Sequence, residues 1–579
     1  MPNLLAMSFE GELAPSFTLH CLDAGRTLPD GWGLGYYPAG EPSAAILKEP
    51  APPQASMRSQ LALAWEQVAS NMFMLHIRHA TWGALSDANT QPFSHPYGRR
   101  DWLVGHAGSL DKKPESKGPF EPVGSTDTEA MFCLLLNRFI EHGWRSLMEV
   151  DLEVLQEWLS ELNKTGELTM CLTDGRDLLA YADRRHNIPL WVGLLMPPYD
   201  KIAFGDDDLE VDLTRRGAKS RKGAIVCSEE LEARDGDADR SIVWRKLAPG
   251  TLMVIREGAI ITERIPEASP ALAPRLVRRP VRAEPRRYDV THRTVYKYEK
   301  AIESSLHTLR LTPMHDRLQN VVSTNLFISV QGQSRDYEDV FGNRVRRLIV
   351  DAPFDEMVVE CKSVVDVLDT DPLGFGPLRV QSTIPLVWMP WQRQVLEAFL
   401  LPVELPETEL AELAEYAMSF VKRNDYDLLD TLLDINHTIF REYAYKQGVT
   451  TVLTSAFDVY SRREGVCQDF TNLMICLARL LGVPARYVCG YIYTGPKNAS
   501  GTTNTVQSEA SHAWVQLYLP QVGWKGFDPT NGILTQTDHV RVAVGRNYID
   551  ATPTSGTIFV GGGGTETLSV DVRVEQHRE

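Results

Sequence analysis

The chain has 579 residues, of which 43% are hydrophobic and 23% are charged. This composition is that of globular domains, and it excludes a disordered or collagen-like chain. A chain of this length is too long for one core, so we expect several domains. The formal net charge of −17 argues against a nucleic-acid-binding protein, because binding to phosphates requires a basic surface.

The eight cysteines are spread along the chain without a Cys-x-x-Cys pair. This usage indicates reduced thiols and neither a disulfide framework nor a zinc site. The first residues, MPNLLAMSFEGELAP, lack the basic and then apolar pattern of a secretory signal, and no run of about 18 apolar residues follows. We therefore expect a cytoplasmic protein without a membrane span, a bound metal or a cofactor.

The N-terminal region carries a series of short motifs. In chain order they are LLAMS (4–8), DGWGLGYY (30–37), IRHATWG (77–83), GHAGSL (105–110), STDTEA (125–130) and VCSEEL (226–231). Their content and order resemble the class II glutamine amidotransferases. The resemblance implies that residues 1–265 form an αββα sandwich of the N-terminal-nucleophile type.

Two positions depart from that family's catalytic pattern. The family's nucleophile is a cysteine directly after the initiator methionine, and here that position is Pro2. Its oxyanion donor is the asparagine of a His-Asn-Gly motif, which here reads His106-Ala107-Gly108. Proline has no thiol and alanine has no side-chain donor, and losing one oxyanion donor alone costs about 10²–10³ in rate. We therefore expect an inactive amidotransferase-like domain.

Part of the ligand-holding shell of that family is nevertheless present. Arg78 and Asp127 match the residues that hold the carboxylate and the amino group of glutamine. The resemblance thus implies a domain that binds an amino-acid-like group or a partner without turning it over. The alternatives are an active glutaminase and a reaction at the secondary amine of Pro2.

Residues 266–287, PEASPALAPRLVRRPVRAEPRR, contain five prolines and six arginines and show neither helical nor strand periodicity. Proline stiffens such a segment and like charges extend it, as in interdomain linkers. We therefore expect a linker here. The alternative is an arginine-rich segment that grips an acidic partner.

After this segment, residues with period-two alternation predict strands. In YDVTHRTVYKYE (288–299) aromatic and β-branched residues recur at every second position. Further strand-like runs follow at 326–330, 345–350 and 357–367, with a turn at 341–343. We expect a small β domain over residues 288–375.

The remaining residues, 376–579, mix helical and strand patterns. From 391 to about 447 the apolar residues take helical spacing, as in ETELAELAEYAMSFVKR. The segment CQDFTNLMICLARLL (467–481) predicts a buried helix that ends at Gly482 and Pro484, and ARYVCGY predicts a strand after it. The prediction for the whole chain is therefore an α+β multidomain protein.

Cys467 falls at the first turn of the predicted buried helix. Unpaired N–H groups and the helix dipole favour a thiolate there, which is the nucleophilic form of cysteine. His512 begins a predicted strand, HAWVQLYLP, and Asp528 ends a short strand just before a Pro-Thr-Asn-Gly turn. Taken singly, each has a structural alternative: a packed thiol, a buried histidine and a turn-capping aspartate. Taken together, they supply the nucleophile, base and orienting group of covalent acyl chemistry.

Residues 288–560 resemble the bacterial transglutaminase-like proteins, whose core is related to papain. The matching stretches are GVCQDF, LARLLGVPARYVCGYIYTG, ASHAWVQLYLP, GWKGFDPTNG and DHVRVAVGRNY. The resemblance implies that Cys467 is the nucleophile, His512 the general base and acid, and Asp528 the residue that holds the imidazole. The Cys467 N–H is an expected oxyanion donor. The segment 443–445 is a candidate for the second donor.

These features lead us to expect a thiol-dependent enzyme that acts on a peptide, isopeptide or side-chain amide through a Cys467 thioester. The resemblance favours hydrolysis over cross-linking, and family context adds a peptide ligase of the ATP-grasp type as a partner. The alternatives are a non-catalytic scaffold and a glutamine-dependent amidotransferase.

Overall fold

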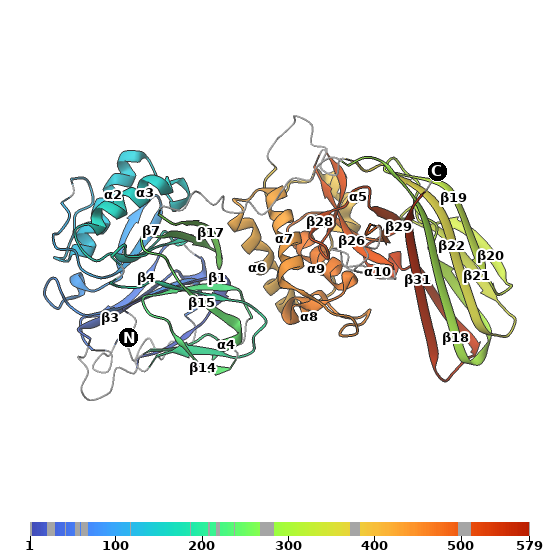
Figure 1. Ribbon diagram of the computed structural model, residues 1–579, viewed down its shortest axis with the longest axis horizontal. Coiled ribbons are helices and arrows are strands. Elements are labelled where there is room, and N and C mark those ends of the chain that lie inside the picture. The colour runs from blue at the N-terminus through green and yellow to red at the C-terminus, as the bar shows by residue number, and fades with distance from the viewer. Residues whose placement is uncertain are drawn as a thin grey trace. The chain divides into compact units, whose positions relative to one another are not determined.

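The computed structural model describes residues 3–19, 29–40, 42–52, 58, 68–115, 117–185, 187–206, 209–215, 220–236, 238–266, 283–370, 382–495, 511–520 and 522–577 (Figure 1). They belong to two compact units, Met1–Arg275 and Leu276–Glu579. Most of the expected linker lies outside the described residues. Within the described ranges, no helix is both long enough and apolar enough to span a membrane.

The first unit is built on two sheets that pack face to face. The seven-stranded sheet runs in the order β15-β10-β13-β1-β5-β3-β4, and the six-stranded sheet in the order β17-β16-β9-β8-β7-β6. Side chains between them, including Leu4, Met74, Leu103 and Cys171, are almost fully buried. The strands are β1 (Leu4–Leu13), β3 (Gly31–Tyr36), β4 (Ala45–Glu49), β5 (Ser70–Arg78), β6 (Phe93–Tyr97), β7 (Arg100–Ala107), β8 (Thr169–Thr173), β9 (Asp177–Tyr181), β10 (Trp191–Leu195), β13 (Gly223–Cys227), β15 (Ile242–Lys246), β16 (Leu252–Arg256) and β17 (Ala259–Arg264).

The outer faces of the two sheets are covered differently. Helices α2 (Asp127–His142) and α3 (Leu152–Asn163) pack on the six-stranded sheet (Figure 1). A sheet of four strands packs on the other: β2 (Ser16–Leu19), β11 (Ile202–Gly205), β12 (Leu209–Asp212) and β14 (Glu232–Gly236), with the short α4 (Ala238–Ser241) after β14. The two helices and the two stacked sheets agree with the expected sandwich of the N-terminal-nucleophile type. In the described residues, the four-stranded sheet lies on the other outer face.

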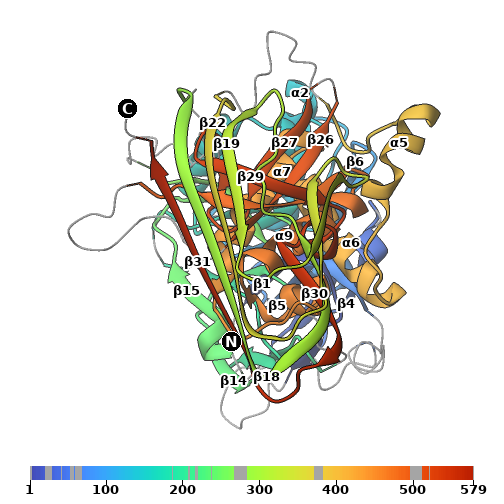
Figure 2. The same cartoon turned by 90° about the vertical axis from the view of Figure 1, so that its right-hand side faces the viewer.

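The second unit begins with a large antiparallel sheet. Its strands are β18 (Arg286–Leu309), β19 (Gln319–Ile328), β20 (Gln333–Glu338), β21 (Arg344–Val350), β22 (Phe354–Val367), β30 (Thr554–Gly561) and β31 (Glu566–Gln576). The 24-residue β18 pairs with β22 and β31 along its first half and with β21 and β30 along its second half. Figure 2 shows β18, β22 and β31 side by side.

This sheet corrects the expected domain limits. The sequence patterns predict that all of 376–579 belongs to the core, but residues 554–576 complete the β domain instead. The turn between β30 and β31 is the glycine run 561–564, whose four residues all have positive φ. Local periodicity shows that a segment is a strand, but it does not show which distant strand it joins.

The core of the second unit surrounds α9 (Cys467–Leu480), whose Leu473, Met474 and Leu477 are fully buried. Helices on one side are α5 (Pro390–Leu400), α6 (Glu407–Arg423), α7 (Leu428–Glu442) and α8 (Ala456–Arg462). On the other side lies a sheet in the order β28-β27-β26-β25-β29. Its strands are β25 (Ala485–Ile492), β26 (His512–Leu519), β27 (Gly523–Asp528), β28 (Ile533–Leu534) and β29 (His539–Gly545), with α10 (Tyr548–Ala551) after β29. The predicted helix and strand at 467–491 are thus observed almost residue for residue.

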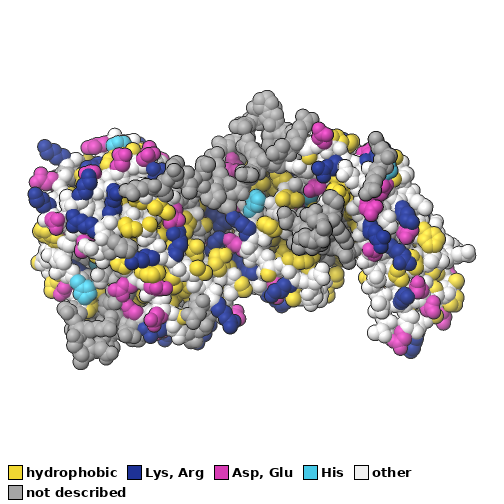
Figure 3. Space-filling model, in the orientation of Figure 1, with side chains coloured by type: hydrophobic (Ala, Val, Ile, Leu, Met, Phe, Trp, Pro, Cys, Tyr) yellow, Lys and Arg dark blue, Asp and Glu magenta, His cyan; other side chains and the backbone are white. Residues whose placement is uncertain are grey.

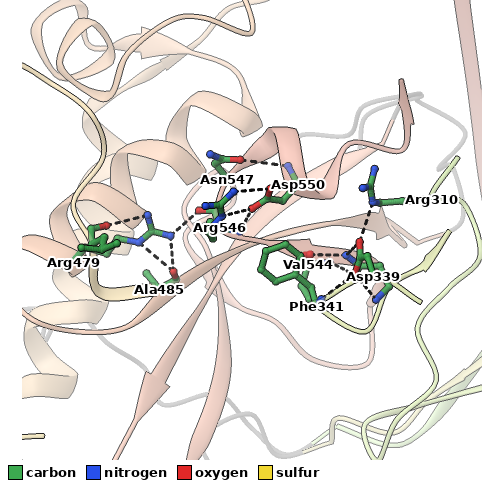
Figure 4. A network of polar contacts seen from close by, with 11 residues as sticks. Arg310, Asp339, Phe341, Arg479, Ala485, Val544, Arg546, Asn547 and Asp550 are labelled. Carbon is green, nitrogen blue, oxygen red and sulfur yellow. Dashed lines mark hydrogen bonds and ion pairs between the residues drawn. The ribbon is translucent and has the colours of Figure 1, made fainter. Parts of the chain in front are cut away.

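Polar side chains from the β domain hold the free edge of β29. The buried Gln319 amide accepts from the Arg541 N–H and donates to the Arg541 carbonyl, each at 2.8 Å. The Asn343 amide exchanges two similar hydrogen bonds with the backbone of Val544. Figure 4 shows the surrounding network, in which Asp339 bonds the turn at Phe341 and the Arg310 guanidinium. Because each amide satisfies a buried backbone group, these contacts fix β29 in position.

The surface carries charges of both signs. On the face in Figure 3, acidic and basic side chains are interspersed among hydrophobic ones in the coloured part of each unit. This mixed pattern differs from the continuous basic stripe that contacts with a phosphate backbone require.

Candidate active site

Cys467 is the first residue of α9 and is 9% exposed. Its N–H lies in the first turn, where backbone donors have no carbonyl partner within the helix. The preceding Val466 is held by Asp469, whose carboxylate accepts from the Val466 N–H at 2.8 Å and from the Thr450 hydroxyl at 2.7 Å. A thiol at this place is close to the positive end of the helix dipole, which stabilises an anion.

The proposed second oxyanion donor at 443–445 is only partly supported. This segment does lie beside the site, because β23 (Ala444–Tyr445) pairs with β24 (Glu464–Gly465), two residues before Cys467. However, the Tyr443 N–H donates to Ile439 and the Ala444 N–H donates to Arg463. These two donors are therefore engaged in the fold.

His512 and Asp528 meet at one end of the five-stranded sheet. His512 is the first residue of β26, and Asp528 is the last residue of the antiparallel neighbour β27. His512 Nε2 lies 2.9 Å from Asp528 Oδ2, and the two residues are 2% and 0% exposed. Since Nε2 is directed at the carboxylate, Nδ1 is the ring nitrogen left for the thiol. The sequence-predicted trio is thus brought together by α9, β26 and β27.

The charges in this cluster are strongly coupled. Burial alone lowers the pKa of His512, but the Asp528 charge and hydrogen bond, followed by a hydrogen bond with Cys467, outweigh burial and raise that pKa to about 10. Burial raises the pKa of Asp528, yet His512 and His539 outweigh it and hold that pKa well below its usual range. Both pKa shifts favour an imidazolium beside a carboxylate at neutral pH. A cationic imidazole next to sulfur is the setting that favours a thiolate.

The sequence prediction did not assign two further partners of Asp528. The Asn531 amide donates to Asp528 Oδ2 at 2.7 Å, and His539 Nε2 lies 3.2 Å from the same oxygen. The Thr530 and Asn531 N–H groups donate to Oδ1. Asp538 and His539 belong to DHVRVAVGRNY, one of the motifs that resemble the family. In the sequence, the one feature that could have pointed to His539 is this Asp-His pair at the start of a predicted strand.

Two histidines and an aspartate that lie this close together can also be the ligands of a metal ion. In the described residues, ligand atoms of His512, Asp528 and His539 lie within 4.8 Å of one another. Both Nε2 atoms, however, lie at hydrogen-bond distance from a single carboxylate oxygen. Two N–H donors on one acceptor account for this geometry, so we assign the group to the thiol site.

In the first unit, Arg78 ends β5 and is 4% exposed. Its Nη2 donates to the carbonyls of Trp82, Gly83 and Ala84, whereas its Nη1 is buried without a hydrogen-bond partner. A buried guanidinium nitrogen with unused donors is costly unless a ligand takes them. Arg78 therefore keeps unused hydrogen-bond donors at this position.

Asp127 begins α2 and is 3% exposed. Its two oxygens accept from the Leu110 and Thr128 N–H groups, at 2.8 and 2.9 Å. Ala107, at the position of the family's oxyanion donor, ends β7 and is buried between the two sheets. Its methyl side chain cannot donate a hydrogen bond. Pro2 lies outside the described residues.

Comparison with protein families agrees with this division of the chain. Residues 1–276 match the glutamine amidotransferases class-II model. Residues 288–366 match the bacterial transglutaminase-like N-terminal region, and residues 414–529 match the transglutaminase-like superfamily. The last match includes Cys467, His512 and Asp528.

Individual relatives cover different parts of the chain. An uncharacterized protein of Mycobacterium tuberculosis is 32% identical over 302 residues, which are 50% of this chain and 92% of that protein. A protein of Escherichia coli, named as a glutamine amidotransferase of unproven activity, is 28% identical and covers 43% of this chain and 95% of its own. A solved structure from Cytophaga hutchinsonii, described as a cysteine protease of unproven activity, is 20% identical, covers 52% of this chain and 93% of its own, and has a TM-score of 0.40. The chain therefore belongs to the bacterial transglutaminase-like proteins, in a form that also carries a class II glutamine amidotransferase-like domain.

Proposed function

We propose that the second unit cleaves amide bonds with Cys467 as the nucleophile. The observation that carries this proposal is the buried 2.9 Å contact between His512 and Asp528, beside a thiol at the N-terminus of a helix. This arrangement supplies a nucleophile, a proton carrier and a fixed orienting charge. An isolated buried cysteine would need none of these partners.

The reaction would proceed in two stages. The Cys467 thiolate attacks the amide carbon, and the Cys467 N–H stabilises the negative charge that develops on the carbonyl oxygen. His512 then gives its proton to the departing amine as the C–N bond breaks, which leaves a thioester and a neutral imidazole. Next, His512 removes a proton from water, and the hydroxide attacks the thioester carbon. The C–S bond then breaks, which releases the acid and restores the Cys467 thiolate beside the His512 imidazolium. An amine in place of water would give transamidation.

We propose a peptide or protein amide as the substrate and hydrolysis as the main outcome, since the family resemblance is to the protease-like branch. A peptide attached by an ATP-grasp-type ligase is one substrate of this class.

The experiment is to incubate the full chain with a peptide library that contains backbone, γ-glutamyl and ε-lysyl amides, with and without hydroxylamine. Mass spectrometry then reads the products and the protein mass. We expect amide cleavage, hydroxamates when hydroxylamine is present, and an acyl adduct that maps to Cys467 and is absent in Cys467→Ala. If Cys467→Ala cleaves as fast as the wild type, the proposal is wrong. If neither form cleaves and Cys467 alkylates no faster than the other cysteines, a scaffold role is favoured.

We further propose that the first unit binds an amino-acid-like group without hydrolysing it. The support is the unpartnered, buried Nη1 of Arg78 together with the replacements Pro2 and Ala107. Arg78 would hold a carboxylate, and Asp127 would hold an ammonium group. The unit would then present or recognise a substrate and would not supply ammonia.

Calorimetric titration of the full chain with L-glutamine tests this second proposal. We expect binding that Arg78→Ala and Asp127→Asn each weaken about 10–100-fold, since a hydrogen bond to a charged group contributes about 1.5–3 kcal/mol. Arg138→Ala, which removes a guanidinium packed on Trp158, is the matched control and should bind normally. Release of ammonia from glutamine, or equal binding by all variants, would contradict the proposal.

A further inference from the structure

His539 is held between two carboxylates. Its Nε2 lies 3.2 Å from Asp528 Oδ2, and its Nδ1 lies 2.7 Å from Asp538 Oδ1. An ionised carboxylate only accepts hydrogen bonds, so both ring nitrogens must donate. A histidine that donates from both nitrogens is an imidazolium. His539 is 2% exposed, so this positive charge is buried and compensated on both sides.

We propose that His539 is a positioning residue of the thiol site, an imidazolium that fixes Asp528 from the side opposite His512 and offsets part of its negative charge. This inference rests on the proposed thiol chemistry and extends it. The series Cys467, His512, Asp528, His539 and Asp538 thereby becomes one alternating chain of acids and bases. In this chain His512 moves the proton, whereas His539 stays charged.

The position of His539 is set by a rigid strand. His539 is the first residue of β29, which pairs with β25 on one edge and is held by Gln319 and Asn343 on the other. The Trp514 ring meets the His539 ring edge to face, with centroids 5.0 Å apart. These contacts leave the imidazole little freedom to rotate. Because the His539 ring is fixed, its Nε2–H also fixes the orientation of the Asp528 carboxylate.

The charges around His539 support the same role. Burial lowers the pKa of His539, but Asp538 and then Asp528 outweigh burial and raise it to about 9. Charged or titratable groups that face this pair from other elements are His512 on β26, Asp369 after β22, and Arg286 and Tyr288 on β18. Among the causes of the shift, the Asp538 charge is the largest that raises the pKa. Asp538 is therefore the group that keeps His539 charged.

A shared carboxylate has a consequence for catalysis. Asp528 stabilises the His512 imidazolium less strongly when a second cation, 6.3 Å from the His512 ring, shares its charge. Without His539, Asp528 would hold the His512 proton more tightly, and the thiolate would lose a nearby positive charge. Both changes move the pH range of the thiolate–imidazolium pair upward.

The test compares His539→Gln and Asp538→Asn in the full chain, by the rate of Cys467 labelling with iodoacetamide between pH 4 and 10. This probe needs no substrate. For His539→Gln we expect the whole profile to move up on the order of one pH unit, from one charge removed at this distance. Asp538→Asn keeps the ring but removes the charge that raises its pKa. Where the His539 ring becomes neutral, the profile should shift in the same direction but by less, because the negative charge of Asp538 is lost as well. His577→Gln, which removes a histidine paired with Asp289 in the β domain, should leave the profile in place.

Circular dichroism checks that each variant is folded. If His539→Gln does not fold, the comparison of Asp538→Asn with the wild type is the test. If the wild type shows a fast-labelling Cys467 and both variants keep its profile, His539 is only structural and this inference is wrong. If the wild-type Cys467 labels no faster than the other cysteines, the proposed thiol chemistry itself fails. The two failures are therefore distinguishable.

Discussion

Replacing His512 by asparagine is expected to lower turnover roughly 10⁴–10⁶-fold, because the acid and the base of the reaction are the same side chain. The variant should also lose the preferential labelling of Cys467 below pH 7. An unperturbed cysteine thiol, with a pKa of about 8.5, is well under 1% thiolate at pH 6. An adjacent imidazolium favours the thiolate, although a thiolate of low pKa is intrinsically less nucleophilic. We therefore expect at least about a tenfold loss of labelling at pH 6.

The measurement is the rate of iodoacetamide labelling at each cysteine, read by peptide mass spectrometry from pH 5 to 9. The buried Cys476 in the middle of α9 is an internal reference, since burial raises the pKa of its thiol to about 12. His142→Asn, at an exposed position of α2 in the first unit, is the matched histidine control. Equal labelling of Cys467 in the wild type and in His512→Asn would mean that the thiol and the imidazole do not act as a pair.

The elements that carry the site were predictable because each is encoded locally. Apolar spacing defines α9, and period-two alternation defines β26. Helix α9 begins at Cys467 and strand β26 begins at His512. An error of one helical turn in the predicted start of α9 would therefore have moved Cys467 away from the helix N-terminus. The roles of the three residues came from the family pattern and not from periodicity.

Contacts that depend on strand order were not predictable in this way. Asp528 and His539 stand at the two ends of a connection that leads from β27 to β29, and β25 and β26 lie between those strands. Only the folded structure shows that Asp528 and His539 lie at the same end of the five-stranded sheet. The same reason applies to residues 554–576, which pair with a strand more than 200 residues earlier.

Replacing Asp528 by asparagine is the second large effect, and the hydrogen bonds around the side chain show why. The Thr530 and Asn531 N–H groups require an oxygen at the Oδ1 position. The amide nitrogen of an asparagine would then occupy the Oδ2 position and would face the Nε2 atoms of His512 and His539. Donor would meet donor, so both histidines would have to lose their Nε2 protons. His512 would hold its proton on Nδ1 and could no longer take one from the thiol, and we expect turnover to fall roughly 10⁴-fold.

This variant should also change how stability depends on pH. The folded-state pKa values of His512 and His539, about 10 and about 9, lie above the ordinary value of 6.5. Their contribution to stability is therefore complete below pH 6.5 and is lost as the pH rises through about 9 to 10. Asp528 has a depressed pKa, so its contribution is present above its ordinary value of 3.8 and is lost in stronger acid. This cluster is thus most stabilising between pH 4 and 6.5.

In Asp528→Asn the histidines no longer hold extra protons in the folded state. Removing one partner of a buried ion pair costs about 3–5 kcal/mol. The loss should be largest near pH 6 and should shrink toward pH 10, because the wild type alone loses stability over that range. Calorimetric unfolding at several pH values measures this difference, and Asp336→Asn, at an exposed ion pair with Arg346, should leave the alkaline slope unchanged. A loss of stability that stays constant from pH 6 to 10 would show that Asp528 acts through packing and turn geometry, and that the two histidines are neutral in the folded protein.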